Sequence, residues 1–272
     1  MKYIMLTLFI LSSFLIAKAA SVDTIAIFSN AMHKSIRCVV VTPDSYKDKE
    51  QHYPVVYILH GYSGNYADYV KKVPAVVAMA DAYQEILVFP DGGFSSWYLD
   101  SPVDSAMRFE TYVGKEIPAW IDQHYRTKAS RQFRAITGLS MGGHGALYLA
   151  IRHQETFGAA GSMSGGVDFR PFPNNWDLAL RLGTYKDHAD NWDKNVVVNQ
   201  LPGLKNDSLA LIIDCGVKDF FIDVNRQLHQ HLLEQGINHD YIERPGEHNW
   251  EYWSNSIMYQ LFYFNRFFGR SR

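Results

Sequence analysis

The sequence predicts an α/β protein with a mostly parallel central sheet and helices on both of its faces. Short apolar runs typical of buried strands alternate with longer segments of helical periodicity. The chain also contains no linker, internal repeat or low-complexity run. Without its N-terminal apolar segment it keeps about 250 residues, a length that suits one domain. We therefore expect a single domain over residues 20–272.

The expected strands are mostly apolar or β-branched runs bounded by turn-forming residues. In chain order they cover residues 24–29, 36–41, 55–59, 85–89, 133–136, 159–163, 209–213 and 240–243. Strands that are separated by helices pair in parallel, because a helical crossover returns the chain to the same end of the sheet.

The expected helices cover residues 66–83, 104–125, 146–151, 224–233 and 253–268. Pro118 lies inside the second of them and should kink or divide it, since proline removes one backbone donor. Met258, Leu261 and Phe264 recur at helical spacing in the last one. This spacing indicates that the aromatic tail is a helix that packs on the core.

Residues 166–207 lack clear periodicity and contain Pro171 and Pro173 together with Trp176 and Trp192. A stretch of this length without evident secondary structure is often functional in a compact domain. We expect a cap of short helices, with Trp176 as one wall of a substrate pocket. The alternative is a surface loop without a role in binding, which its tryptophans anchor to the domain.

The segment Gly138-Leu139-Ser140-Met141-Gly142 stands between an expected strand and an expected helix. A G-x-S-x-G at such a junction is typical of the nucleophile elbow of the α/β-hydrolase fold. Its serine sits on a sharp, strained turn, and the glycines remove side chains that would clash with the adjoining strand and helix. The pattern therefore predicts this fold with Ser140 as nucleophile. The alternative is a glycine-rich turn with an uninvolved serine.

A serine hydroxyl needs a base, and in this fold an acid and then a histidine follow the nucleophile along the chain. Asp219 lies in the loop after strand 209–213 and is favoured as the acid over Asp214, which falls at the strand's end. Asp214 would instead hold the loop by accepting backbone N–H bonds. His248 follows the last expected strand in a loop with proline and glycine, and is the expected base.

Hydrolysis through a tetrahedral intermediate also requires backbone N–H donors for the developing oxyanion. The amide of Met141, directly after the nucleophile, is one expected donor. The second should come from the loop after the early strand 55–59, and Tyr62 is the residue we expect there.

Trp97 and Tyr98 follow strand 85–89, which should end at the same edge of the sheet. Such a pair could stack on a flat aromatic acid or on a sugar ring. It could equally brace the loops under the catalytic residues. The pair and Trp176 are the expected substrate-binding residues.

The chain resembles the esterase D-like family of α/β-hydrolases, which includes feruloyl and acetyl-xylan esterases, S-formylglutathione hydrolases, enterochelin esterases and mycolyltransferases. The resemblance spans residues 54–268. It is carried by Leu59-His60-Gly61, Pro90-Asp91-Gly92-Gly93, Ser96-Trp97-Tyr98-Leu99-Asp100-Ser101-Pro102, Thr137-Gly138-Leu139-Ser140-Met141-Gly142-Gly143, Asp214-Cys215-Gly216 with Asp219, and Gly246-Glu247-His248 with Trp250. It implies the same triad, Ser140, Asp219 and His248, and the same oxyanion amides.

Residues 1–19 are typical of a secretory signal peptide. Lys2 precedes an apolar run over residues 3–17, and Ala17-Lys18-Ala19 fits a small-x-small cleavage site. The apolar run is short for a membrane span, which makes a membrane anchor the weaker alternative. We expect a periplasmic or secreted protein without a stable membrane anchor.

The composition argues against nucleic-acid, metal and cofactor partners. The formal net charge is −2, whereas a nucleic-acid partner calls for a basic surface. The two cysteines, Cys38 and Cys215, lie in apolar, strand-like surroundings and are expected to be buried thiols. No C-x-x-C or H-E-x-x-H spacing occurs, so neither a metal nor another cofactor is expected.

These features predict an exported serine carboxylic-ester hydrolase that works through an acyl-enzyme. Feruloyl or acetyl esters of plant polysaccharide best suit an exported family member with aromatic loops. The same residues would serve a broad short-chain acyl esterase or an acyltransferase to a sugar. A non-catalytic binding protein that retains the fold is the alternative from another class.

Overall fold

In the computed structural model, which describes residues 19–270, eight strands form one sheet. The strands are β1 (Ser21–Ser29), β2 (Lys34–Thr42), β3 (Val55–Leu59), β4 (Ile86–Pro90), β5 (Arg134–Gly138), β6 (Ala159–Met163), β7 (Ala210–Gly216) and β8 (Asp240–Arg244). Their order is β1-β2-β4-β3-β5-β6-β7-β8. Pairs β1–β2 and β2–β4 are antiparallel and all others are parallel. The mostly parallel sheet is thus confirmed.

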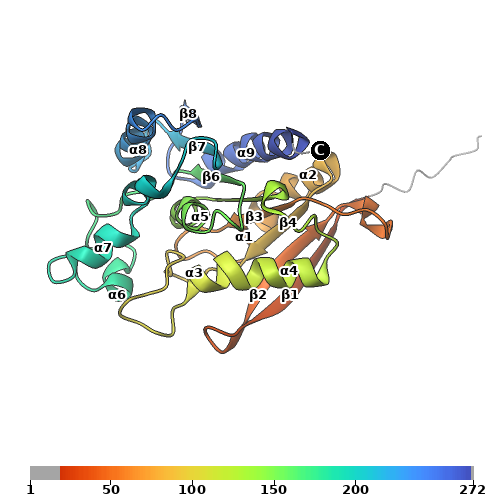
Figure 1. Cartoon of the computed structure of the whole chain (residues 1–272), viewed down its shortest axis with the longest axis horizontal. Helices are drawn as coiled ribbons and strands as arrows, with labels where there is room; N and C mark the ends of the chain where they lie inside the picture. Colours follow the sequence, from red (N-terminus) through yellow and green to blue (C-terminus); the bar gives the residue numbers. More distant parts are fainter. Residues whose placement is uncertain (1–18, 271–272) are drawn as a thin grey trace, which may run out of the picture.

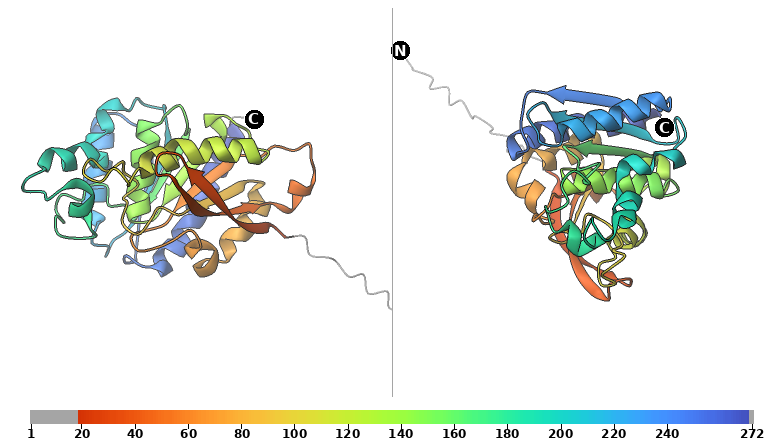
Figure 2. Two further views of the ribbon diagram at one scale, coloured as in Figure 1. Left: turned by 90° about the horizontal axis from the view of Figure 1, so that it is seen from below. Right: turned by 90° about the vertical axis from the view of Figure 1, so that its left-hand side faces the viewer.

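Helices cover both faces of this sheet (Figure 1, Figure 2). They are α1 (Asp68–Lys72), α2 (Ala75–Tyr83), α3 (Phe109–Thr111), α4 (Ile117–His124), α5 (Met141–Arg152), α6 (Leu178–Leu182), α7 (Ala189–Asn195), α8 (Ile222–Glu234) and α9 (Trp250–Arg270). Short turns of other helix types are η1 (Asp44–Lys47), η2 (Tyr112–Glu116), η3 (Arg131–Phe133), η4 (Val197–Asn199) and η5 (Leu201–Gly203).

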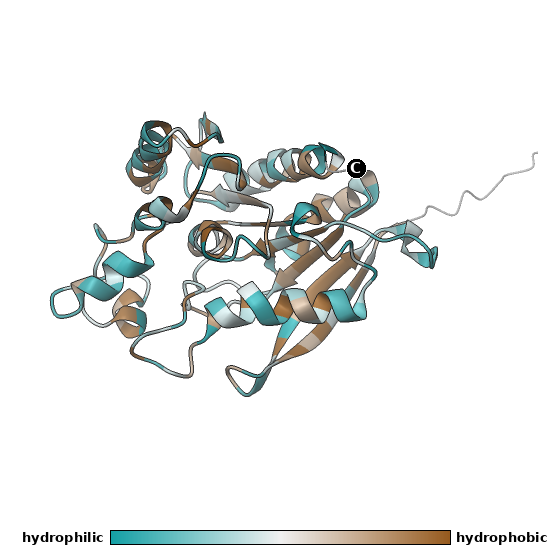
Figure 3. Ribbon diagram, viewed as in Figure 1, coloured by the Kyte–Doolittle hydropathy of each residue, from teal (hydrophilic) through white to brown (hydrophobic). Residues whose placement is uncertain are grey.

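Alternating side chains of the strands build two cores, because successive residues of a strand point to opposite faces. Val55 and Tyr57 of β3 belong to the core under α4, α5 and α8. Val56 and Ile58 belong to the core under α1, α2 and α9. Figure 3 shows the consequence, a sheet of mostly apolar strands between helices in which hydrophobic and hydrophilic residues are mixed.

One of the expected helices is divided and another contains a π-helical turn. Residues 66–83 form α1 and α2, because Pro74 follows Val73, whose backbone leaves the helical region at φ −131° and ψ 67°. Residues 104–125 become helical only from Phe109 and pass through the π-helical turn η2 before α4. Pro118 lies in the first turn of α4, directly after η2, so its missing N–H coincides with a change from π to α hydrogen bonding and not with a break in the helix.

The segment 166–207 consists of short helices, α6, α7, η4 and η5, and lies at one end of the molecule (Figure 1). Trp192 is fully buried there, and its Nε1 donates to the carbonyl of Gly183 at 2.9 Å. It therefore anchors the segment. Trp176 is only partly buried and lines a pocket, so the two tryptophans divide the two expected roles between them.

The expected signal peptide lies, apart from Ala19, outside the described residues. Within residues 19–270 no helix combines the length and apolar character that crossing a membrane requires. Cys38 and Cys215 are both free and buried, which confirms the expected thiols, and burial raises the pKa of each. The described part of the chain holds no group of three His, Cys, Asp or Glu side chains suited to a metal ion.

Candidate active site

Ser140 occupies the turn between β5 and α5 with φ 55° and ψ −115°. A non-glycine residue rarely adopts this conformation, which costs on the order of 1–3 kcal/mol. A Cβ atom on Gly142 would lie 2.6 Å from the His60 carbonyl oxygen, and one on Gly138 would lie 2.7 Å from Leu59 Cβ. Both positions therefore need glycine for the steric reason that predicted the elbow.

The three residues of the expected triad lie in one hydrogen-bonded row. Ser140 Oγ is 2.9 Å from Nε2 of His248, and Nδ1 of His248 is 2.8 Å from Asp219 Oδ2. The backbone N–H of Phe221 donates to Asp219 Oδ1 at 2.8 Å and so orients the carboxylate. A carboxylate at Nδ1 favours the tautomer that leaves Nε2 free to accept the serine proton.

Asp214 lies outside this row and has a different function from the one expected. Its carboxylate is fully buried and accepts hydrogen bonds from Arg244, the Tyr252 hydroxyl and Ser256 Oγ. Burial raises its pKa, against the opposing effect of the Tyr252 hydrogen bond and the Arg244 charge. Its partners are thus side chains of β8 and α9, which corrects the expectation that it accepts backbone N–H bonds.

The two expected oxyanion donors are available. Ser140 N donates to the Met163 carbonyl at 2.9 Å and Gly142 N donates to the Leu139 carbonyl at 2.7 Å. Between them, the amide of Met141 has no acceptor within residues 19–270, and the same is true of the Tyr62 amide. Met141 is also the first residue of α5, so the positive end of the helix dipole adds to its attraction for an anion.

His60, which sequence reasoning did not single out, fixes the loop that carries Tyr62. Its Nε2 accepts from the Gly92 amide at 2.8 Å, and its Nδ1 donates to the Gly61 carbonyl at 2.8 Å. Burial lowers the pKa of His60, in agreement with the neutral ring that these partners require. The His60-Gly61 dipeptide at the end of β3 is the sequence feature that could have indicated this role of His60.

Trp97 and Tyr98 lie beneath the pocket and not in its wall. They are 1% and 0% exposed. Tyr98 donates its hydroxyl proton to the His60 carbonyl at 3.0 Å, and Trp97 Nε1 donates to the Trp176 carbonyl at 3.2 Å. This corrects the expectation of substrate contact and gives the pair the alternative role of bracing the loops.

The pocket at Ser140 has a volume of about 340 Å³ and an aromatic wall. Besides Ser140 and His248, it is lined by Tyr62, Trp176, Phe220, Trp250 and Trp253. The rings of Trp176 and Phe220 are nearly parallel, at 19° with centroids 5.6 Å apart. Phe220 is 49% exposed and its ring centroid lies 4.2 Å from that of His248. Sequence reasoning missed Phe220, although it directly follows the acid.

His144, on α5, connects the loop that carries Trp97 to the cap segment, residues 166–207. Its Nδ1 lies 3.1 Å from the Trp97 carbonyl oxygen and its Nε2 lies 2.9 Å from that of Asn195. The ring is fully buried, and this burial lowers its pKa to about 4 despite both carbonyls. His144 is therefore neutral at pH 7.

Acidification should destabilise the fold through His144. The pKa of His144 is lower in the folded protein than its value of about 6.5 in the unfolded chain. Between pH 6.5 and pH 4 the unfolded chain therefore binds a proton at this residue that the folded protein does not bind, and the unfolding free energy falls. The loss is up to about 3 kcal/mol of unfolding free energy. Urea denaturation of wild type and His144→Gln at pH 7 and pH 4.5 measures it. An equal pH dependence in both proteins would contradict the assignment.

Comparison with known proteins identifies the family. The profile of the family described as "Putative esterase" matches residues 29–264. An acetyl esterase of Caldicellulosiruptor saccharolyticus is 27% identical over 85% of this chain and 92% of its own length. Esterase Rv1288 of Mycobacterium tuberculosis is 30% identical over 77% of this chain, which spans 51% of that protein.

The fold agrees with these sequence matches. A solved structure of a ferulic acid esterase superposes with a TM-score of 0.79 and 28% identity, over 92% of this chain and 99% of that one. An S-formylglutathione hydrolase from Agrobacterium tumefaciens shares the fold with a TM-score of 0.76 at 22% identity, over 92% of this chain and 96% of that one. The chain therefore belongs to this esterase family and is a serine carboxylic ester hydrolase of the α/β-hydrolase fold.

Proposed function

We propose that the chain is an exported esterase that hydrolyses feruloyl or acetyl esters of plant polysaccharide. The aromatic wall of Trp176 and Phe220 beside Ser140 is the observation that supports an aromatic acyl group in the substrate. The names of a ferulic acid esterase and an acetyl esterase among the similar proteins support it. The signal-like pattern of residues 1–19 supports export.

The proposed mechanism follows from the row of hydrogen bonds. Nε2 of His248 takes the proton of Ser140 Oγ as that oxygen attacks the ester carbonyl, and the amides of Tyr62 and Met141 receive the oxyanion. The alcohol leaves with the proton from His248, and an acyl-enzyme remains. Water then attacks the acyl group by the same route. Asp219 stabilises the imidazolium in both steps.

A planar aryl acid fits the wall better than a branched aliphatic acid does. Aromatic rings attract each other in offset or edge-to-face arrangements at centroid distances of about 4.5–7 Å. Phe220 is half exposed and lies against His248, so its free face can meet an acyl ring bound at Ser140.

Phe220→Ala should therefore lower kcat/KM for methyl ferulate about tenfold, because an aromatic contact and its buried area are lost. Turnover of p-nitrophenyl acetate, whose acyl group has no ring, should change less than about threefold. Phe262→Ala is the matched control, since Phe262 is 51% exposed on α9 and does not line the pocket. An equal loss on both esters would mean that Phe220 supports His248 and not the acyl group.

The substrate class itself is tested with methyl ferulate, acetylated xylan and p-nitrophenyl acetate side by side. Release of ferulate from methyl ferulate or of acetate from acetylated xylan supports the proposal and separates hydrolysis from acyl transfer to a sugar. Turnover of the activated acetate alone would overturn it in favour of a broad short-chain esterase.

A further inference from the structure

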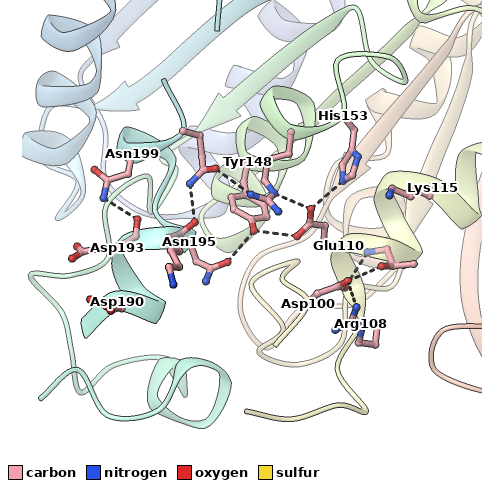
Figure 4. A pocket seen from close by; sticks show the side chains of 14 residues that line it. Asp100, Arg108, Glu110, Lys115, Tyr148, His153, Asp190, Asp193, Asn195 and Asn199 are labelled. Atoms are coloured by element: carbon pink, nitrogen blue, oxygen red, sulfur yellow. Dashed lines mark hydrogen bonds and ion pairs between the residues drawn. The ribbon is translucent and has the colours of Figure 1, made fainter. Parts of the chain in front are cut away.

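A second cavity, larger than the pocket at Ser140, lies between the core and the cap segment (Figure 4). Its volume is about 980 Å³, near the upper end of the range of about 300–1,000 Å³ for small-molecule sites. Its walls come from residues 100–115, from the C-terminal half of α5, and from α7 with the turn after it. Ser140 directly precedes α5, and Tyr148, which lines the cavity, lies about 12 Å further along the axis of this helix.

The walls are polar and electrically balanced. They hold four basic and four acidic side chains, namely Arg108, Lys115, Arg152 and Lys194, and Asp100, Glu110, Asp190 and Asp193. Arg108 pairs with Asp100 at 3.0 Å and Arg152 with Glu110 at 2.8 Å. With no excess of either sign, the cavity suits an uncharged ligand that offers both donors and acceptors.

At the floor of the cavity, two hydrogen-bond acceptors share a single donor. The Tyr148 hydroxyl lies 3.1 Å from Glu110 Oε2 and 2.9 Å from Asn195 Oδ1. Both of these atoms are acceptors, because Nδ2 of Asn195 already donates to the Asn191 carbonyl at 2.7 Å. A phenol has one proton, so one of the two acceptors goes without it. The three side chains are only 2%, 8% and 9% exposed, which makes an unmatched acceptor costly.

Glu110 does not supply the missing proton. Burial alone would raise its pKa, but hydrogen bonds from His153 and Arg152 hold the pKa at about 2. The carboxylate is therefore ionised at neutral pH. A hydroxyl group on a ligand would complete the cluster.

The rim offers further groups for such a ligand. Within the described residues, the ammonium groups of Lys115 and Lys194 and the carboxylate of Asp190 have no ion-pair or hydrogen-bond partner. Lys115 and Asp190 stand on opposite sides of the cavity (Figure 4). A ligand that spans the cavity can thus accept a hydrogen bond at one side and donate one at the other.

We propose that this cavity binds a short neutral oligosaccharide, whose hydroxyls donate to the Tyr148–Glu110–Asn195 cluster and pair with Lys115 and Asp190. The inference rests on the proposed function in one respect, that the polysaccharide bearing the ester supplies the sugar chain. The cap segment then has two tasks: Trp176 walls the acyl pocket, and α7 walls the sugar site.

The test is calorimetric titration of the mature enzyme with unesterified xylotetraose. Wild type should bind it saturably, and the double variant Lys115→Ala, Asp190→Ala should bind it about tenfold more weakly, because two hydrogen bonds are lost. The matched control is Lys186→Ala, Asp223→Ala, whose positions are exposed and outside the cavity. Both double variants should turn over p-nitrophenyl acetate like wild type, which also verifies that they fold.

Equal affinity in wild type and the cavity variant would place the sugar elsewhere and overturn the proposal. Absence of xylotetraose binding to wild type would overturn it as well, and so would preferential binding of tetragalacturonate, a charged chain. Because the titration uses no ester, its outcome is independent of methyl ferulate and acetylxylan turnover. Failure of the sugar site and failure of the proposed function are therefore distinguishable.

Discussion

Ser140→Ala is expected to lower kcat for p-nitrophenyl acetate by about 10⁶-fold, the loss typical of removing a nucleophile that acts together with its base. The Ser140 hydroxyl bonds only to Nε2 of His248 among the described residues. Alanine meets the same backbone strain at φ 55°. The Tm should therefore stay within about 2 °C of that of wild type.

A fluorophosphonate probe gives this prediction a second readout. The probe should label wild type at one site and leave the variant unlabelled, since it reacts only with an activated hydroxyl. More than about 1% residual turnover in a preparation that the probe fails to label would contradict the role of Ser140. An unlabelled, inactive wild type would instead favour the non-catalytic binding protein.

The sequence predicted the row Ser140, Asp219 and His248 because covalent geometry and chain order both constrain it. A strained turn between strand and helix admits few residue types, and Gly138 and Gly142 occupy positions where a Cβ would overlap β3 and its loop. The end of a parallel strand also determines at which edge of the sheet a following loop emerges. Asp219 after β7 and His248 after β8 must therefore lie near the end of β5.

Burial of the aromatic side chains could not be read from the sequence in the same way. Trp97 and Tyr98 follow β4 at the correct edge, but they turn inward with φ of 53° and 58°. Phe220 follows Asp219 and stays exposed, whereas Phe221 beside it is buried. Which aromatic of such a pair faces the substrate depends on the packing of the cap, whose short helices have no periodic signal.

The last expected result separates the two aspartates that follow β7. Asp219→Asn should lower kcat about 10⁴-fold, because an amide no longer favours the tautomer with a free Nε2 or stabilises the imidazolium. Asp214→Asn should leave kcat within a few-fold of wild type and lower the unfolding free energy by about 3 kcal/mol, because the Arg244 charge loses its buried partner.

Both variants replace one carboxylate oxygen by an amide nitrogen of nearly equal size, so each serves as the control for the other. Steady-state turnover of p-nitrophenyl acetate and urea denaturation measure the two effects. Asp214 lies at the base of the loop that carries His248, since it accepts hydrogen bonds from Tyr252 and Ser256 of α9. It therefore stabilises the fold, and it affects catalysis only by holding this loop in position. A 10⁴-fold loss of kcat in well-folded Asp214→Asn, with Asp219→Asn still active, would transfer the acid's role to Asp214. The 2.8 Å contact between Asp219 Oδ2 and His248 Nδ1 predicts the opposite.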